Sequence, residues 1–371
     1  MTITVPQIDL PSGSRLEVVR YDLTDPDGNL LGELNPVIKP DAPAIRTSIG
    51  GQANRVLTLR IIPEQAETLD PRLMRISPYW IDTDLTAYPL GVYRILDVTV
   101  AQFSGGDKIE LTCGSEDSTH HTPITRSFTW GRDTPVSEII PEIAGVLGIG
   151  DVDADETTDV IGEPLAFPVG SADWYDVYAN VAFAAGMLTP FFTLAGTWRW
   201  RIVPEWETAA ADHIYSTDLT APLAQQKIVQ QSLVRSVTLL DSPNVFYAIN
   251  SAARGARIVG SYRLPASAPN SAERIGEDVA AFVEVASMAT TAAANNAARA
   301  FAARTLTDIG SASMNTPLDA RHELYDTVEV NGLIYQENGT GVRLSPGGEM
   351  GHDLTRVYRA GDPEPDLAGV L

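Results

Sequence analysis

The sequence is poor in cysteine and in lysine. Its single cysteine, Cys113, excludes a disulfide within the chain and any structural zinc site built from cysteines. Because Cys113 lies in a strand-like segment, we expect a small buried residue there rather than a catalytic thiol. Only three lysines stand against twenty-three arginines. Together with the abundance of alanine, this indicates a genomic composition bias rather than a functional signal.

Long apolar runs and known catalytic patterns are also missing. No stretch approaches 18 uninterrupted apolar residues, so no membrane span is expected. No basic segment followed by an apolar one opens the chain, so no secretory signal is expected. The spacings typical of zinc proteases, nucleophile-elbow hydrolases and P-loops do not occur. Carboxylates are too numerous to single out a glycosidase pair. We therefore expect no enzymatic activity and no cofactor.

Positive charge is scarce overall. Lys and Arg total 26 against 48 Asp and Glu, which gives a formal net charge of −22. This balance disfavours attractive binding to nucleic acid, because neutralising phosphates requires Lys and Arg. Two interpretations of the acidity stay open. It serves solubility alone, or it provides a wall past which DNA can slide without being held.

Histidine is scarce, and its five copies are spread out. His120 and His121 are adjacent, but neighbouring residues on a strand face opposite ways. His213, His322 and His352 are scattered along the sequence, and no third ligand lies near the pair. The sequence therefore predicts no metal site at histidine.

One acidic loop has part of a calcium-binding pattern. Asp151, Asp153 and Asp155 have the spacing of the first three carboxylates of an EF-hand loop. Such a loop needs glycine at its sixth position and glutamate at its twelfth, where this chain has Glu156 and Gly162. We expect a solvated acidic loop instead, and no metal.

Alternation of apolar and polar residues is the main structural signal. In residues 55–62, Leu57, Leu59 and Ile61 point one way while Arg and Thr interrupt the other side, which is typical of a half-buried strand. Similar segments with turn signals between them predict a small barrel or sandwich over residues 1–115. The other expected strands are 15–23, 30–38, 44–49, 73–81, 89–100 and 108–115.

Helical periodicity appears in residues 116–225, which we expect to form an α+β unit. Residues 134–149 predict a helix with Thr134 as its N-cap and a kink or break at Pro141. Residues 171–186 predict a second helix that starts at Ser171 and stops at Gly186. A hairpin follows over 189–203, with its turn at residues 195–196.

Strands resume in residues 226–360, which we expect to form a second small barrel with one helix. The helix is predicted at 290–306 from its alanine content. Asn331-Gly332 and Asn338-Gly339 are turn dipeptides. Residues 361–371 read as a free acidic tail. The expected strands are 232–240, 244–250, 257–264, 311–315, 326–331 and 355–360. The fold class is thus mainly β, with two β-rich units flanking an α+β unit.

Aromatic residues cluster in the central unit and have two possible roles. A cluster of this kind forms either a core, in which the helix packs on the hairpin, or a surface that binds carbohydrate or protein. Trp174 and Tyr178 are four apart on the expected helix, which favours the core. The full set is Trp174, Tyr175, Tyr178, Trp198, Trp200 and Trp206.

Several segments occur in an order that resembles the tail hub (baseplate hub, minor tail) proteins of tailed bacteriophages. In the first unit the matching residues are Arg55, Leu59, Arg75, Pro78, Tyr79, Pro89, Leu90, Gly91 and Tyr93. In the central unit they are Leu147-Gly148, Trp174, Trp198 and Trp200. In the last unit they are Ala303, Arg304, Leu306, Asp326, Val328 and Val330. The segment after Gly332 departs most from the family pattern.

The resemblance implies a fold and a function. The fold would have two tube-like β-barrels, so that three copies present six similar barrels to a sixfold tail tube. The function would be that of a structural virion protein at the tail tip, made in the host bacterial cytoplasm, which forms a ring through which DNA passes without specific binding. Implied partners are two further copies, a distal tail or tube protein, a tape-measure protein and tip or fibre proteins. The alternative is a receptor- or carbohydrate-binding tail-tip module using the aromatic cluster. A tail-associated hydrolase is a third possibility.

Overall fold

The computed structural model describes residues 18–36, 45–49, 54–81, 85–103, 106–218, 220–222, 233–237, 242–250, 257–285, 287–306, 310–344 and 348–362. Residues 1–12 and all but the first two residues of the acidic tail lie outside this set. None of the helices in the described residues is long and apolar enough to cross a membrane.

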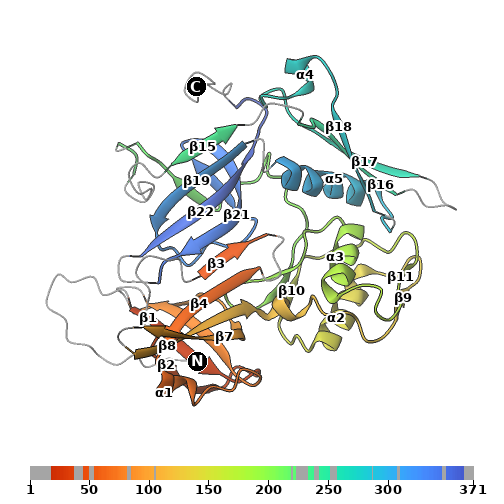
Figure 1. Ribbon diagram of the computed structural model, residues 1–371. Helices are drawn as coiled ribbons and strands as arrows, with labels where there is room; N and C mark the ends of the chain where they lie inside the picture. The colour runs from red at the N-terminus through yellow and green to blue at the C-terminus, as the bar shows by residue number, and fades with distance from the viewer. Residues whose placement is uncertain are drawn as a thin grey trace.

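The N-terminal part is a curled sheet around one apolar core (Figure 1). The alternation predicted for residues 55–62 is confirmed, because Leu57, Leu59 and Ile61 are all buried in that core. Cys113 is buried beside them, as expected. The elements are β1 (Val18–Thr24), β2 (Leu30–Leu34), β3 (Ile45–Ser48), β4 (Arg55–Ile61), α1 (Pro63–Ala66), β5 (Arg75–Ile81), β6 (Ala87–Pro89), β7 (Tyr93–Phe103) and β8 (Gly106–Ser115).

The central part has two helices packed with short strands. Both predicted helices are present, as is the hairpin, whose turn contains Gly196 at φ 89°. The second helix is capped by Asp173 rather than Ser171, because the Asp173 side chain accepts a hydrogen bond from the Asp176 amide. The elements are η1 (Glu116–Thr119), β9 (Phe128–Trp130), α2 (Val136–Leu147), β10 (Val152–Ala154), β11 (Leu165–Phe167), α3 (Trp174–Ala184), β12 (Phe191–Phe192) and β13 (Trp198–Trp200).

Helix α2 starts later than expected, and of the kink or break expected at Pro141 the break is absent. Pro135 occupies the N-cap position, so Thr134 lies outside the helix. The helix runs without a break through Pro141. An internal proline removes one backbone hydrogen bond, and the buried stripe of Val136, Ile139 and Ile143 stabilises the helix on either side of that loss.

The C-terminal part has two pieces. In one, α5 covers a three-stranded sheet of order β17-β16-β18; in the other, β19 to β22 form a larger sheet (Figure 1). Sequence analysis missed β14, β18 and β21. The elements are β14 (His213–Tyr215), β15 (Val234–Val237), β16 (Val245–Asn250), β17 (Ile258–Arg263), α4 (Ala272–Ile275), β18 (Ala280–Glu284), α5 (Thr291–Thr305), β19 (Gly310–Pro317), β20 (Thr327–Val330), β21 (Leu333–Val342) and β22 (Glu349–Val357).

The two Asn-Gly dipeptides behave differently. Asn331-Gly332 forms the predicted turn between β20 and β21, with φ of 52° and 78°. Asn338-Gly339 was expected to be a turn, and this is wrong: it lies inside β21, where the register with β22 shifts between Glu337 and Gly339. The dipeptide is therefore a bulge, which accommodates an extra residue without ending the strand.

One continuous sheet joins the two β-rich parts. β21 pairs antiparallel with β3, from Gly339 opposite Ser48 to Val342 opposite Ile45. Within the described residues the strand order runs β15-β19-β22-β21-β3-β4-β8-β7-β5-β1-β2. The mainly β fold with an α+β part is confirmed. Within the same residues neither β-rich part closes on itself by strand pairing; they share a sheet instead. The boundaries at 115, 225 and 360 stay predictions.

Four residues of the aromatic cluster, Trp174, Tyr178, Trp198 and Trp200, lie in one core, as the helix spacing favoured; Trp206 packs in a second core, and Tyr175 is partly buried. Trp198 and Trp200 are both 0% exposed, and Tyr178 lies edge-on to Trp198 with ring centroids 5.4 Å apart. Trp174 packs edge-on to Phe128 of β9 and belongs to the same core cluster as the hairpin residues Trp198 and Trp200. Fully buried rings cannot contact a carbohydrate, so the alternative surface role loses the observation that suggested it.

We expect the Trp198→Ala variant to lose about 3–5 kcal/mol of unfolding free energy, because a large buried ring is replaced by a cavity. Urea unfolding followed by fluorescence measures this loss. The exposed Val169→Ala serves as the control and is expected to change stability by less than about 0.5 kcal/mol. A Trp198→Ala variant as stable as wild type would contradict the assignment of this ring to the core.

Candidate functional site

The continuous sheet has one face of small polar residues. Across β19, β22, β21 and β3, the side opposite the core carries Ser, Asn, Gly and a few charged groups. This face is hollowed where these four strands meet. The residues that the register places on it are Ser313, Asn315, Glu349, Gly351, Asp353, Gly339, Gly341, Arg46 and Ser48.

Charges on this polar face are mixed in sign. Arg46 and Arg343 line the hollow together with Glu349 and Asp353. Two cations and two carboxylates cancel formally, so this part of the face has no cationic stripe that would hold phosphates.

Beneath the opposite face, one loop touches all three parts of the molecule. We call residues 318–326, between β19 and β20, the junction loop. Leu318 packs in the core of the N-terminal part. Leu324 and Tyr325 pack with Phe191 of the central hairpin, and the Tyr325 and Phe191 ring centroids are 5.5 Å apart. The junction loop therefore fixes how the three parts sit on one another.

A buried arginine on β4 anchors the junction loop. Arg55 is 2% exposed and donates to the Phe192 carbonyl and to the Glu323 carboxylate. Glu323 also accepts a hydrogen bond of 2.7 Å from the Leu194 amide. Burial raises the pKa of Glu323, and Arg55 and the Leu194 amide oppose that rise. This contact links the N-terminal sheet, the central hairpin and the loop at one point.

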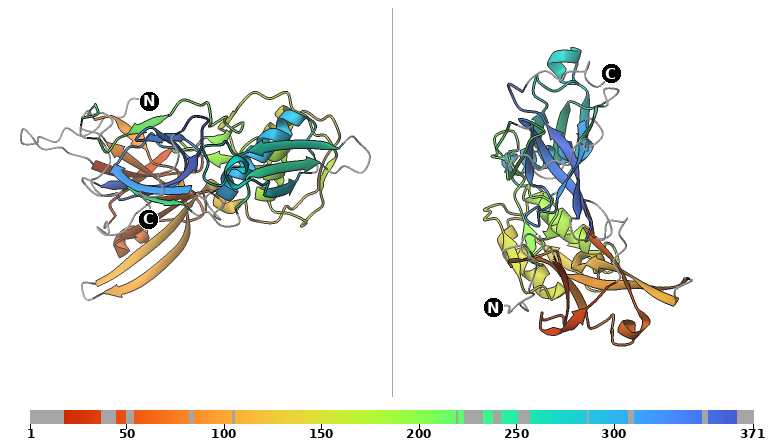
Figure 2. Two further views of the ribbon diagram at one scale, coloured as in Figure 1. Left: turned by 90° about the horizontal axis from the view of Figure 1, so that it is seen from above. Right: turned by 90° about the vertical axis from the view of Figure 1, so that its left-hand side faces the viewer.

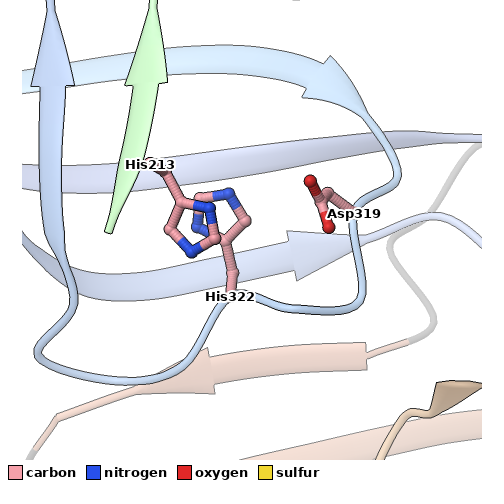
Figure 3. Close-up of side chains that lie close together, drawn as sticks. All are labelled: His213, Asp319 and His322. Atoms are coloured by element: carbon pink, nitrogen blue, oxygen red, sulfur yellow. The ribbon is translucent and has the colours of Figure 1, made fainter. Parts of the chain in front are cut away.

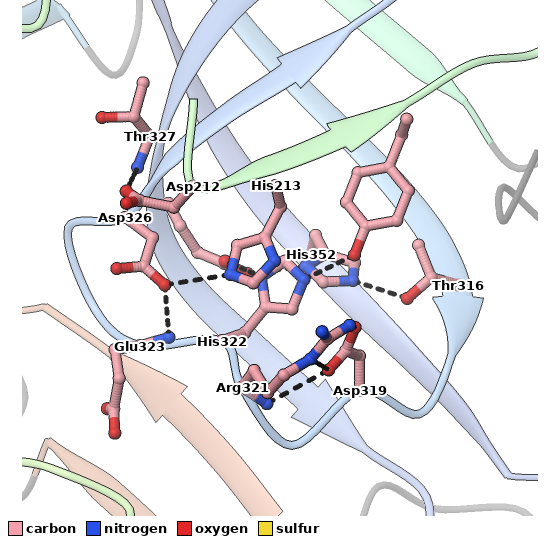
Figure 4. Close-up of polar contacts among 12 residues, drawn as sticks. Asp212, His213, Thr316, Asp319, Arg321, His322, Glu323, Asp326, Thr327 and His352 are labelled. Atoms are coloured by element: carbon pink, nitrogen blue, oxygen red, sulfur yellow. Dashed lines mark hydrogen bonds and ion pairs between the residues drawn. The ribbon is translucent and has the colours of Figure 1, made fainter. Parts of the chain in front are cut away.

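On its other side the junction loop enters a cluster of histidines (Figure 4). The Glu337 carboxylate on β21 lies between His322 of the loop and His352 of β22, and the three side chains are completely buried. His352 Nδ1 is 2.6 Å from Glu337 Oε1, and His322 Nδ1 contacts Oε2. These histidines are scattered along the sequence, and folding brings them together.

Hydroxyl groups complete the cluster. Tyr215 Oη on β14 is 2.5 Å from His322 Nε2, and Thr316 Oγ1 is 2.8 Å from His352 Nε2. The Thr316 hydroxyl also lies within donating distance of the Pro317 carbonyl, at 3.0 Å. The two imidazoles thus each have a partner at both ring nitrogens.

The surroundings shift the pKa values of this cluster. Burial alone raises the pKa of Glu337, but the two imidazoles outweigh burial and hold that pKa at about 2. Burial lowers the pKa of His322, and Glu337 only partly opposes this. The carboxylate is therefore ionised at neutral pH, and His322 resists a second proton.

The cluster fits hydrogen bonds better than a metal ion. Two ligands of a tetrahedral zinc ion lie about 3.3 Å apart when each bond is about 2.0 Å, whereas His352 Nδ1 and Glu337 Oε1 are only 2.6 Å apart. His213, Asp319 and His322 also lie close together (Figure 3). The rings of His213 and His322 are stacked at 3.6 Å and 15°, so their in-plane lone pairs run side by side and do not converge on one ion.

The remaining candidates from the sequence have ordinary partners. His120 is buried among Tyr178, Phe192 and Trp198, and burial lowers its pKa to about 4. His121 stacks on Tyr175 and contacts Asp173. The partners of the calcium-like loop come from β13 and its turn: Arg199 pairs with Asp153 and Asp155, and Thr197 donates to Asp151. These carboxylates therefore support the hairpin.

Comparison with known proteins gives matches in structure only. No protein-family model and no curated protein match the sequence. A tail protein from Neisseria meningitidis is similar, with a TM-score of 0.63 and 12% identity over 91% of this chain and 97% of that one. The 43 kDa tail protein of prophage MuSo2 from Shewanella oneidensis has a TM-score of 0.61 and 10% identity, over 92% and 98%.

A third match extends the pattern. The prophage tail protein gp18 from Listeria monocytogenes has a TM-score of 0.53 and 11% identity, over 95% of this chain and 97% of that one. All three matches span nearly the whole of both chains, so the likeness covers the arrangement of all three parts. The resemblance stated from the sequence is thereby confirmed at the level of the fold. This chain has the fold of bacteriophage tail proteins.

Proposed function

We propose that this protein is a structural component of a phage tail, a hub at the tail tip whose continuous sheet forms part of a ring around the path of the DNA. The pairing of β3 with β21 carries this proposal. This pairing joins four strands of the C-terminal part to four strands of the N-terminal part. We call these eight strands, in the order β15-β19-β22-β21-β3-β4-β8-β7, the wall. Three copies of such a wall would present six four-stranded halves to a sixfold tube.

Both ends of this wall have open edges within the described residues. β5 pairs with β7 only at Arg94 and Tyr93, so β7 has an unpaired edge from Ile95 to Phe103. The far ends of β7 and β8 form a hairpin that projects from the rest of the molecule (Figure 2). At the other end, β15 pairs only with β19. Unpaired edges of this kind are templates for further strands.

The strand directions fit head-to-tail assembly. All seven pairings between the eight strands of the wall are antiparallel. Because the number of strands is even, β15 of a second copy can run antiparallel to β7 of the first. A head-to-tail contact that closes after three copies gives a ring, which would present six similar halves.

The polar face suits the inner surface of such a ring. Small side chains leave room for a duplex, and cancelling charges do not hold phosphates. Partners of the ring would be a distal tail or tube protein on one side and tip or fibre proteins on the other. A tape-measure protein and DNA would pass through it. The absence of a catalytic pattern in the sequence supports a structural role.

Cysteine cross-linking tests the ring. A variant with Val100→Cys on β7 and Val234→Cys on β15 should give a covalent trimer under oxidising conditions, because both residues are exposed on the two open edges. Val98→Cys with Val234→Cys covers the register shifted by two residues. Non-reducing electrophoresis and light scattering measure the product.

Two controls distinguish edge pairing from chance collision. Each single variant should give no trimer, since a head-to-tail bond needs both edges. Leu31→Cys on β2 paired with Val234→Cys should also give none, although Leu31 is just as exposed. The ring would be refuted if this control cross-linked to the same extent. It would also be refuted if the protein stayed monomeric both alone and in assembled tails.

A further inference from the structure

Helix α2 carries a glycine that nothing within the described residues explains. Gly145 lies in the helix interior, where glycine is destabilising relative to alanine. Its φ is not positive, and a Cβ added there would meet no atom within 4 Å. Alanine would therefore suit the folded chain better than glycine does. What glycine provides at this position is a bare backbone that another chain can approach closely.

Gly145 lines an open groove between α2 and β10. The groove has a volume of about 890 Å³. It is apolar on the helix side, because the buried residues Ile140 and Ala144 line it. Ser137, Pro141 and Gly145 also line it; they are exposed and four residues apart, so they share one face of the helix. Small side chains along this face leave room for the main chain of a bound segment.

Pro141 adds a hydrogen-bond acceptor to the same face. Proline has no amide hydrogen, so the helical bond from position 141 to the Ser137 carbonyl is not made. Both residues line the groove. This wall of the groove therefore includes a carbonyl that the regular bonding of the helix does not satisfy.

Opposite the helix, β10 has an open edge. In the sheet of order β10-β13-β12, β10 pairs only with β13 within the part of the chain that the structure describes. The Asp151 carbonyl and the Asp155 amide both bond to β13, each at 2.9 Å. Backbone groups alternate in direction along a strand, so those of Val152 and Ala154 point away from β13. These groups are a template for one further strand.

The groove is acidic where it meets β10. Asp155 and Glu156 line it, and the neighbouring Asp153 side chain is 62% exposed. Arg199 pairs with Asp153 and Asp155, whereas Glu156 makes no ion pair among the described residues. Three carboxylates thus face one cation, so a bound segment with lysine or arginine would meet the opposite charge.

We propose that this groove binds an extended, basic segment of another protein, which adds as a strand to the open edge of β10 and passes its main chain over Gly145. Hydrogen bonds to Val152 and Ala154 hold the segment, and its alternate side chains select it. Apolar residues of the segment face Ile140, and lysine or arginine faces Glu156. This contact does not depend on the ring, whose edges are β7 and β15.

A synthetic peptide of alternating lysine and valine is the probe. The full-length protein should bind it, and the amides of Val152 and Ala154 should then exchange with solvent more slowly, because they gain acceptors. The Asp155 amide, already bonded to the Trp200 carbonyl, should change little. A peptide of alternating glutamate and valine is the control and should not bind, because it would bring like charges together.

Three results would overturn the proposal. One is that the lysine-valine peptide does not bind. Another is that it binds without slowing exchange at Val152 and Ala154. The third is slower exchange at these amides that rises with protein concentration in the absence of peptide, because a second copy of this chain would then fill the groove.

A matched pair of glycine variants separates binding from folding. Gly145→Ala should raise the Tm by about 1–2 °C, because alanine is the better helix former. It should weaken binding of the lysine-valine peptide at least about tenfold, because its methyl group takes the space of the peptide main chain. Gly131→Ala is the control, since Gly131 is also exposed and without a positive φ, and its nearest neighbour to an added Cβ lies at 4.0 Å.

The control should leave the affinity for the peptide unchanged, because Gly131 does not line the groove. A Gly145→Ala variant that binds the peptide as well as wild type would overturn the proposal. A lower Tm for Gly145→Ala would also overturn it, because the folded chain itself would then need the glycine.

Discussion

Replacing Glu337 with glutamine is expected to lower the unfolding free energy by about 3–5 kcal/mol. The carboxylate now accepts from His322 and His352 with one oxygen each. A glutamine offers one oxygen and one amide, so one imidazole N–H would face another donor inside a dry core. The negative charge that both imidazoles contact would also be lost. Breaking a buried pair on one side costs far more than the pair contributes as a whole.

Urea unfolding at pH 7.5 measures this effect, with Glu329→Gln as the control. Glu329 lies on the neighbouring strand β20 and is half-exposed, so its neutralisation should change stability by less than about 0.5 kcal/mol. A loss below about 1 kcal/mol for Glu337→Gln would mean that the cluster rearranges freely, and the account of a satisfied hydrogen-bond network would be wrong.

Replacing Arg55 with methionine is expected to cost about 3–5 kcal/mol. Methionine fills a similar volume but donates no hydrogen bond, so the Phe192 carbonyl and the Glu323 carboxylate both lose the guanidinium, and Glu323 keeps the Leu194 amide. Because burial already raises the pKa of Glu323, removing the cation raises it further. Protonation of Glu323 removes the uncompensated charge and becomes more favourable as the pH falls. The deficit of Arg55→Met relative to wild type should therefore be smaller at pH 5 than at pH 8.

The control for Arg55 lies on the same strand. Arg60 pairs with Glu110 at 3.0 Å on the exposed side of β4, and exposed pairs contribute about 0–1 kcal/mol. Arg60→Met should therefore have a small effect that does not depend on this pH range. If Arg55→Met and Arg60→Met lose similar amounts of unfolding free energy, the effect of Arg55 comes from its charge alone and not from its contacts with the junction loop. A double variant with Glu323→Gln measures the coupling directly.

Local patterns predicted the elements whose cause is local. Helices α2, α3 and α5 and the hairpin at residues 195–196 follow from apolar stripes, alanine content and a glycine turn within a few residues of each other, although the caps of α2 and α3 are not the expected residues. β21 was missed because Asn338-Gly339 has the composition of a turn, and only pairing on both sides, with β22 and β3, keeps the strand going through the bulge. β14 is short, and its parallel pairing with β20 comes from a segment more than a hundred residues away.

The candidate site was less predictable than the fold. His213, His322, Glu337 and His352 come from β14, the junction loop, β21 and β22, and no spacing in the sequence indicates that they meet. Arg55 was singled out only as part of a strand pattern that resembled tail proteins. Its pairing with Glu323, 268 positions away, gives it a role in holding the three parts together.

By itself the sequence determined that this chain is mainly β with helices in its middle, that it is strongly acidic, and that its segments follow the order of phage tail proteins. The tertiary structure decided that the two β-rich ends share one sheet and that the buried histidines surround a single carboxylate. The reason is physical. Alternation and capping depend on neighbours along the chain. The partner of a strand and the residues that contact a buried charge depend on distant segments that come together only when the chain packs.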